Sequence, residues 1–338
     1  MHLVIKLKGC DIYMITEEIK ASRKMIDNSI LYEKRKNIIN KIKQINPKLE
    51  FDYWINSNIL LYVAPIKKIG TLACIYEGDG FDVYIDESFA ENKNNKEVIV
   101  HQLTHELLHI LCREQRNSRG HIKQFGHDWY YNDSMLLGLD EATTQLFADD
   151  IENDILSKEH DPNFFFIKNI MRILKVIIGE EKLMMQYLNF NNDFEEAFNS
   201  LTNNQFDDFA NMMNKIYKLN MKIKIEDNNI NYGQIETTLL ENLQNDMAKM
   251  MKNLISLSIQ RNPDLKVLLE NEFMGNEFNL NDYIKSDTKT IEKKGIENKS
   301  LRKKLLMIKK QIIKSINKEN INEELDNSLD DKDESKKI

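Results

Sequence analysis

The stretch "THELLH" occupies residues 104–109 and has the spacing His-Glu-x-x-His. Apolar residues recur around it with the period of an α-helix, and they are Val98, Ile99, Leu103, Leu107, Leu108 and Leu111. We therefore expect a helix that begins near Asn94, where Glu97 completes the spacing of a capping box. On such a helix, His105 and His109 project from one face on successive turns.

This pair of imidazoles is spaced to bind one metal ion. Both side chains can reach a single ion at about 2.0 to 2.1 Å from each ring nitrogen. Glu106 is displaced around the helix by one residue, which suits a carboxylate that takes a proton from metal-activated water rather than a third ligand. The alternative interpretation is a polar stripe on the exposed face of an ordinary helix.

A catalytic zinc site typically needs a third protein ligand and keeps its fourth position open to water. This chain lacks the extension His-Glu-x-x-His-x-x-Gly-x-x-His, because Cys112 and Gln115 occupy the places of the Gly and of the third His. The other source is a carboxylate on a later helix. The segment "GLDEATTQLFADD" offers Glu141 near the start of such a helix.

"HELLH", followed 32 residues after its last His by the Glu of "LDEATTQLFA", resembles the gluzincin group of zinc metallopeptidases. In that group, a second helix carries a Glu that completes a His2Glu zinc site. The resemblance covers about residues 80–150. It implies His105, His109 and Glu141 as ligands of one zinc ion per chain and Glu106 as the general base.

The resemblance also suggests residues around the metal. Tyr130 or Tyr131 would stabilise the oxyanion, as a Tyr or His does in similar enzymes, unless "WYY" belongs to the core. Asp140 and Gln145 are candidates for orienting a ligand imidazole. His101, one turn before the first ligand, is expected to pack or to support the ligands from behind.

The segment between the two motifs, residues 113–134, is long and polar. It is rich in Arg and His, with Arg113, Arg116, Arg119, His121 and His127. One interpretation is an active-site loop whose cations meet substrate carboxylates or the developing oxyanion. The other is a solvated surface loop. His121 and His127 remain alternative third ligands.

The pattern around the motifs predicts an α+β fold that is mostly helical. Three strands are expected at 58–64, 71–78 and 81–87, the last half-buried, and helices at 16–46, 135–157, 162–178 and, in several pieces, 181–275. The resemblance implies a zincin-like core with a small N-terminal sheet, the HExxH helix and a helical C-terminal half. We expect an N-terminal subdomain at 1–112, a helical subdomain at 113–285 and a charged tail at 286–338.

Composition narrows the class of protein. The chain has 338 residues, 41% of them hydrophobic, so it can bury a sizeable core. Its formal charge of -7 gives no support for nucleic-acid binding. Three cysteines at no framework spacing favour a reducing compartment. No signal peptide or membrane-spanning segment is recognisable, so we expect a cytoplasmic protein, with secretion by a signal-less route left open.

The segment 299–318 predicts a strongly basic amphipathic helix. Such a helix binds an anionic membrane surface or a protein partner. The alternative is that it packs on its own domain, neutralised by the acidic segment at 323–334.

Together these patterns predict a zinc-dependent metallopeptidase that hydrolyses peptide bonds in a peptide or protein substrate. Metal-activated water would attack the carbonyl, with Glu106 as general base. Two alternatives remain open: a catalytically inert zincin-like binding or regulatory module, and an all-helical interaction protein in which "HELLH" is a coincidence.

Overall fold

The computed structural model describes most of the first 274 residues, over the ranges 15–69, 73–77, 81–92, 96–119, 136–152, 162–188, 190–226 and 234–274. The chain divides into two compact units, Met1–Glu236 and Thr237–Ile338. The described residues are mostly helical and include a small mixed sheet, which confirms the α+β class. The expected subdomain boundaries after residues 112 and 285 stay predictions, and the tail at 286–338 lies outside the described ranges.

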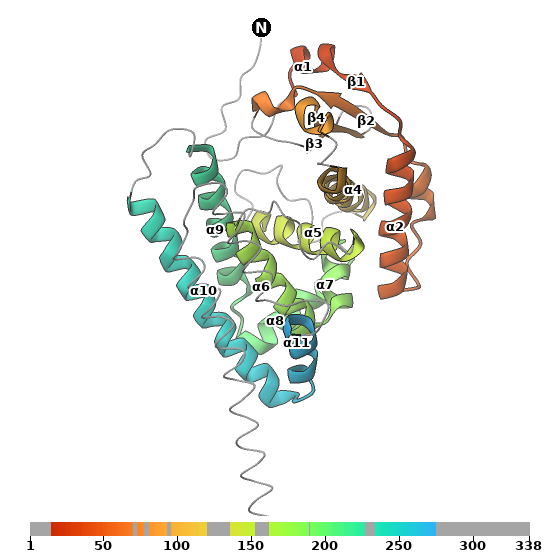
Figure 1. Ribbon diagram of the computed structural model, residues 1–338. Coiled ribbons are helices and arrows are strands. Elements are labelled where there is room, and N and C mark those ends of the chain that lie inside the picture. The colour runs from red at the N-terminus through yellow and green to blue at the C-terminus, as the bar shows by residue number, and fades with distance from the viewer. Residues whose placement is uncertain are drawn as a thin grey trace, which may run out of the picture. The chain divides into compact units, whose positions relative to one another are not determined.

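The sheet has four strands in the order β1-β2-β4-β3 (Figure 1). Its strands are β1 (Lys24–Met25), β2 (Ile59–Ala64), β3 (Ala73–Glu77) and β4 (Phe81–Asp86). β2 and β4 are parallel, whereas β1 and β3 run antiparallel to their neighbours. The three strands expected from the sequence are confirmed, and the short strand β1 is additional.

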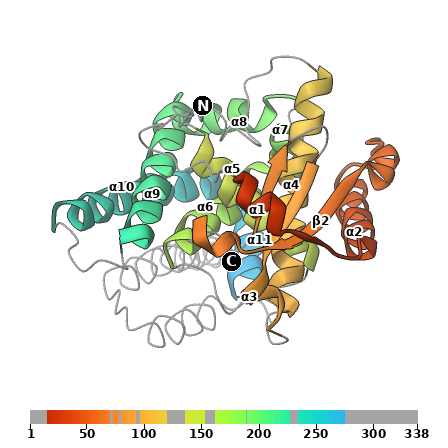
Figure 2. The same ribbon diagram turned by 90° about the horizontal axis from the view of Figure 1, so that it is seen from above.

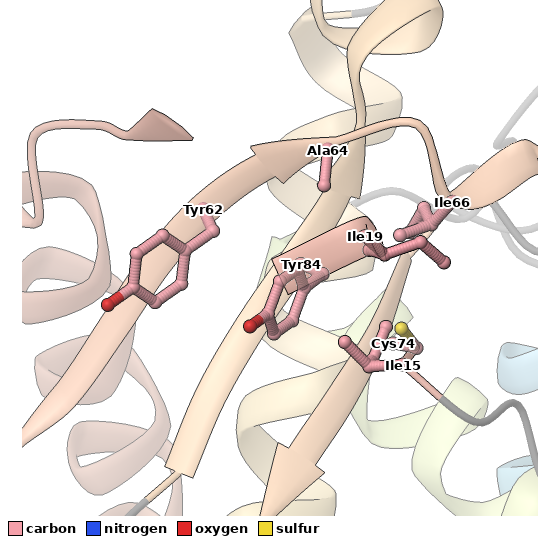
Figure 3. Packing of buried hydrophobic residues seen from close by; sticks show 7 residues of the cluster. All are labelled: Ile15, Ile19, Tyr62, Ala64, Ile66, Cys74 and Tyr84. Atoms are coloured by element: carbon pink, nitrogen blue, oxygen red, sulfur yellow. The ribbon is translucent and has the colours of Figure 1, made fainter. Parts of the chain in front are cut away.

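Both faces of the central strand β4 are covered, so it is not the half-buried strand that its alternation predicted. Phe81, Val83 and Ile85 are buried, but so are Tyr84 and Asp86. The reason is that α1 (Glu17–Ser22) lies over the second face. Figure 3 shows the cluster this forms, made of Ile15, Ile19, Tyr62, Ala64, Ile66, Cys74 and Tyr84.

The helix expected at 16–46 is interrupted. The structure has α1, the strand β1 and then α2 (Ser29–Ile45). Arg23 leaves the helix to bind the Asp82 carboxylate and the Tyr84 hydroxyl, at 3.2 and 2.6 Å. Asn28 accepts a hydrogen bond from the amide of Leu61, which fixes the chain against β2. These partners lie 33 to 61 residues away, so local periodicity did not reveal the break.

Short elements flank the strands of the sheet. The 3-10 turn η1 (Asp52–Asn56) precedes β2, the 3-10 turn η2 (Ile66–Ile69) follows β2, and the short helix α3 (Glu87–Ala90) follows β4 and precedes the next long helix. Asp86 caps α3, because its carboxylate accepts from the amides of Ser88 and Phe89. This explains why Asp86 is buried although it points away from the Phe81 face.

The HExxH helix α4 (Lys96–Arg119) lies on the side of the sheet opposite α1 (Figure 1). It contacts β3 and β4, and Figure 2 shows it running beneath the strands. The next helix, α5 (Leu137–Glu152), packs against α4 on its other side. The HExxH segment is therefore enclosed between the sheet and α5.

The remaining helices of the first unit are α6 (Pro162–Ile178), α7 (Glu180–Tyr187), α8 (Asp193–Thr202) and α9 (Phe206–Glu226). α6 has the bounds that its sequence predicted, with Pro162 at the first position and Gly179 just past the end. Gly179 has φ +111, a backbone conformation that other residues rarely adopt. α6 and α9 both pack against α5 and so fix its position.

The second unit contains most of α10 (Gln234–Arg261) and all of α11 (Leu265–Met274). Along α10, Leu240, Met247 and Leu254 are buried, whereas Leu257 is exposed. No helix within the described ranges is long and apolar enough to cross a membrane. Cys74 and Cys112 are buried free thiols.

Candidate metal centre

His105 and His109 lie on successive turns of α4 and face each other. Their Nε2 atoms are 3.1 Å apart, and the two residues are only 8% and 2% exposed. Leu103, Leu107 and Leu111 are fully buried on the same helix, so the packing of α4 holds the imidazoles in place. The pattern of the sequence therefore places this pair correctly.

Glu141, just past the first turn of α5, completes the group. One carboxylate oxygen lies 3.5 Å from Nε2 of His105, and the other lies 3.6 Å from Nε2 of His109. The ligand atoms of the three residues all fall within 4.8 Å of one another. The structure thus brings together the three residues that the resemblance had linked across 32 positions of sequence.

The spacing of these atoms fits a metal ion. Ligands at about 2.0 to 2.1 Å in a tetrahedron are about 3.3 to 3.4 Å from one another. The two Nε2 atoms are 3.1 Å apart, and each lies 3.5 or 3.6 Å from a different oxygen of Glu141, which is close to that value. Two nitrogens and a carboxylate are a donor set that zinc accepts. These residues can therefore hold one ion, and the distances by themselves do not distinguish zinc from other divalent metals.

Glu106 is buried beside this group. Burial raises the pKa of Glu106 to about 7, an effect that the charge of Glu141 reinforces and the charge of His105 opposes. A carboxylate with a pKa near neutrality exchanges protons readily at physiological pH. This is the property that a general base for water requires.

Acidic neighbours act on the His105 imidazole. Burial lowers the pKa of His105, but the adjacent Glu141 carboxylate and the charges of Glu106 and Asp140 outweigh burial, so that the pKa is raised. Within the described part of the chain, Nδ1 of His105 is a buried atom without a hydrogen-bond partner. An ion on the Nε2 side would hold this ring by a bond that the protein alone does not supply.

Asp140 is placed to support the second imidazole. Its Oδ1 lies 3.7 Å from Nδ1 of His109, and the Asp140 side chain is fully buried. A carboxylate behind a ligand imidazole favours the tautomer in which Nε2 is free to bind metal. The expectation for Asp140 therefore agrees with its location.

Gln145 does not share that role. Its amide nitrogen lies 3.1 Å from Nε2 of His101 and 3.0 Å from Oδ1 of Asp149. His101 in turn lies 2.8 Å from the same Asp149 oxygen, and Lys168 of α6 donates to the other oxygen. This buried network joins α4, α5 and α6 one turn before His105. His101 therefore packs behind the candidate metal group, and its supporting role stays a prediction.

Several predicted residues lie outside the described ranges. Tyr130 and Tyr131, the candidates for the oxyanion, belong to them, as do the alternative ligands His121 and His127. The backbone of α4 is described as far as Arg119, but the side chains from residue 113 onward are not. The proposed roles of the segment at 113–134 remain predictions.

Two buried residues close to the site were not identified from the sequence. The Thr144 hydroxyl hydrogen-bonds to the Asp140 carbonyl, and Tyr187 of α7 lies 2.6 Å from that hydroxyl. The spacing of Asp140 and Thr144, one helical turn, is a signal that the sequence contains. Nothing local indicates Tyr187, which is 43 residues further along the chain.

Comparisons of the chain with known protein families, with curated proteins and with solved structures found no match.

Proposed function

We propose that this chain is a zinc-dependent metallopeptidase with a zincin-like core. The observation that carries the proposal is the convergence of His105, His109 and Glu141 on one point, with the buried carboxylate of Glu106 beside them. Two helices and a sheet hold these groups in a packed interior. A polar stripe on an exposed helix face would not place two imidazoles and two carboxylates together under burial.

Each residue has a distinct role in the proposed reaction. His105, His109 and Glu141 hold the ion, which when bound polarises the substrate carbonyl and lowers the pKa of water. Glu106 takes one proton from the water whose oxygen attacks the carbonyl carbon. It then delivers that proton to the amine nitrogen as the carbon–nitrogen bond breaks. Glu106 returns to its starting state when the two products leave.

The resemblance of the two motifs to those of zinc metallopeptidases supports a peptide as the substrate. β3 lies close to the proposed general base, because burial and then the charge of Glu106 raise the pKa of Cys74 on this strand. β3 also contacts α4, and its residues Ala73, Cys74 and Ile75 are buried, so the strand is part of the packed interior around Glu106.

The test compares the wild type with Glu106→Gln on a peptide library. Gln keeps the shape of the side chain but accepts no proton, so cleavage should fall by at least about a hundredfold. Zinc content should stay unchanged, because Glu106 is not a ligand in this proposal. Glu50→Gln, at an exposed position, is the matched control and should cleave like the wild type.

Equal cleavage by the wild type and Glu106→Gln would show that Glu106 is not the base. A chain that holds zinc but cleaves no peptide would instead be the inert binding module. The four-stranded sheet already contradicts the all-helical architecture of the other alternative.

A further inference from the structure

A chain of buried contacts leads from α7 to the metal centre. It begins at the hydroxyl of Tyr187, which lies 2.6 Å from the hydroxyl of Thr144. The Thr144 hydroxyl lies 2.9 Å from the backbone carbonyl of Asp140 and 3.4 Å from its carboxylate. Asp140 faces Nδ1 of His109 at 3.7 Å. All four residues are at most 2% exposed.

The hydrogen bonds between Tyr187, Thr144 and Asp140 have a fixed direction. Both Asp140 oxygens near Thr144 are acceptors, so the single hydroxyl proton of Thr144 is donated to Asp140. Thr144 can then only accept from Tyr187, whose phenolic proton must point at Thr144. The Asp140 carboxylate faces Nδ1 of His109 at 3.7 Å, and its negative charge favours the tautomer with the proton on Nδ1. Nε2 of that imidazole is unprotonated in this tautomer and can bind a metal.

Tyr187 and its neighbour Cys112 also stay protonated. Burial raises the pKa of Tyr187 well above its usual range, and the charges of Cys112 and Asp140 act in the same direction. Burial likewise raises the pKa of the Cys112 thiol, which hydrogen-bonds to Tyr187. Both groups are therefore neutral at physiological pH, and the direction of the hydrogen bonds does not change there.

We propose that Tyr187 is a positioning residue for the metal centre: through Thr144 and Asp140, it fixes the orientation and tautomer of the His109 imidazole. The inference rests on the proposed metal site and goes beyond it, because it assigns a role to a helix that carries neither motif. Tyr187 does not touch the metal or the substrate. Its effect is on the affinity for the ion.

The expected loss of zinc affinity becomes smaller with each contact away from His109. Replacing a direct partner of a metal-bound imidazole typically weakens metal affinity by about 10 to 100-fold, so Asp140→Asn should fall in that range. Tyr187→Phe acts through two more contacts, and we expect its loss to be about 3 to 10-fold, below that range. The phenyl ring keeps its packing, including the contact with Phe147 at 5.5 Å between centroids.

The test measures zinc affinity of the full chain by competition with a chelator. It also records the visible spectrum of the Co²⁺-substituted protein, which reports ligand geometry. Tyr84→Phe is the matched control. Tyr84 and Tyr187 are both 0% exposed, and each has a hydroxyl in one 2.6 Å contact, with Arg23 and Thr144 respectively. Both variants should lose similar thermal stability, but only Tyr187→Phe should change affinity and spectrum.

A second variant separates positioning from general loosening. Thr144→Val breaks the same chain one step closer to the ligand, so the double variant Thr144→Val/Tyr187→Phe should bind zinc no more weakly than Thr144→Val alone. Additive losses, or a Tyr187→Phe variant with the affinity of the wild type, would overturn the inference while leaving the metal site intact. A wild-type chain that binds no zinc would overturn the proposed function and this inference with it.

Discussion

At the scale of single residues, burial of Glu106 in the folded chain disfavours the ionised form of its carboxylate. Its pKa is raised from 4.5 to about 7 by burial, so the folded chain binds a proton there more tightly than the unfolded chain does. Between these values the native state carries more protons, and stability therefore falls as pH rises through the window. The carboxylate that we propose as the general base therefore destabilises the metal-free fold at neutral and higher pH.

This gives a prediction for the metal-free protein. Glu106→Gln removes the cost of burying a charge, so at about pH 8 it should raise the free energy of unfolding by roughly 1 to 3 kcal/mol. At about pH 5 the wild-type carboxyl is largely protonated, and the two proteins should be nearly equal in stability. Urea unfolding in the presence of a chelator measures both differences. The same difference at both pH values would contradict the raised pKa.

At the scale of elements, the packing of α5 sets the position of Glu141 relative to His105 and His109. Gly138 lies one turn before Glu141, and a Cβ added there would come within 2.5 Å of the Met213 carbonyl oxygen and 2.8 Å of the Asn214 amide nitrogen in α9. Both are backbone atoms, which cannot turn aside. The close approach of α5 and α9 therefore requires glycine at this position.

Gly138→Ala should push α5 away from α9 and carry Glu141 with it. We expect a loss of about 1 to 3 kcal/mol in stability, as for other overpacked interiors, together with weaker zinc binding. Gly179→Ala is the control, because it is strained by its φ of +111 but meets nothing within 4 Å. That variant should lose about 1 to 3 kcal/mol in stability and keep its zinc affinity. Thermal unfolding and chelator competition distinguish the two, and unchanged zinc affinity in Gly138→Ala would contradict the account.

The helices also show which parts of the fold can be predicted from the sequence. The bounds of α6 follow from Pro162 and Gly179, which act within one turn of the helix ends. The break between α1 and α2 depends on Arg23 meeting Asp82 across the sheet, which no local pattern contains. The site divides in the same way. His105 and His109 are fixed by helix geometry, Glu141 needed a resemblance, and Tyr187 was visible only once the chain was folded.

At the scale of the whole molecule, every described helix and strand ends by Met274. The charged segment at 286–338 is expected to be an appendage, with its basic helix at 299–318 available to an anionic surface or a partner. A chain that ends near residue 290 should therefore keep the zinc affinity of the full chain and the helix content of all but the expected helix at 299–318. It should lose any binding to anionic lipid vesicles. Circular dichroism and vesicle sedimentation test this, and insoluble protein after truncation would show that the segment belongs to the core.

Elemental analysis of the purified full chain shows whether His105, His109 and Glu141 hold one zinc ion, as we propose. We expect one zinc per wild-type chain after dialysis. Glu141→Ala should lose the ion, because two imidazoles alone leave the site short of a ligand. Glu50→Ala, at an exposed position, should retain it. A wild-type chain without stoichiometric zinc that also takes up none at neutral pH would contradict the account.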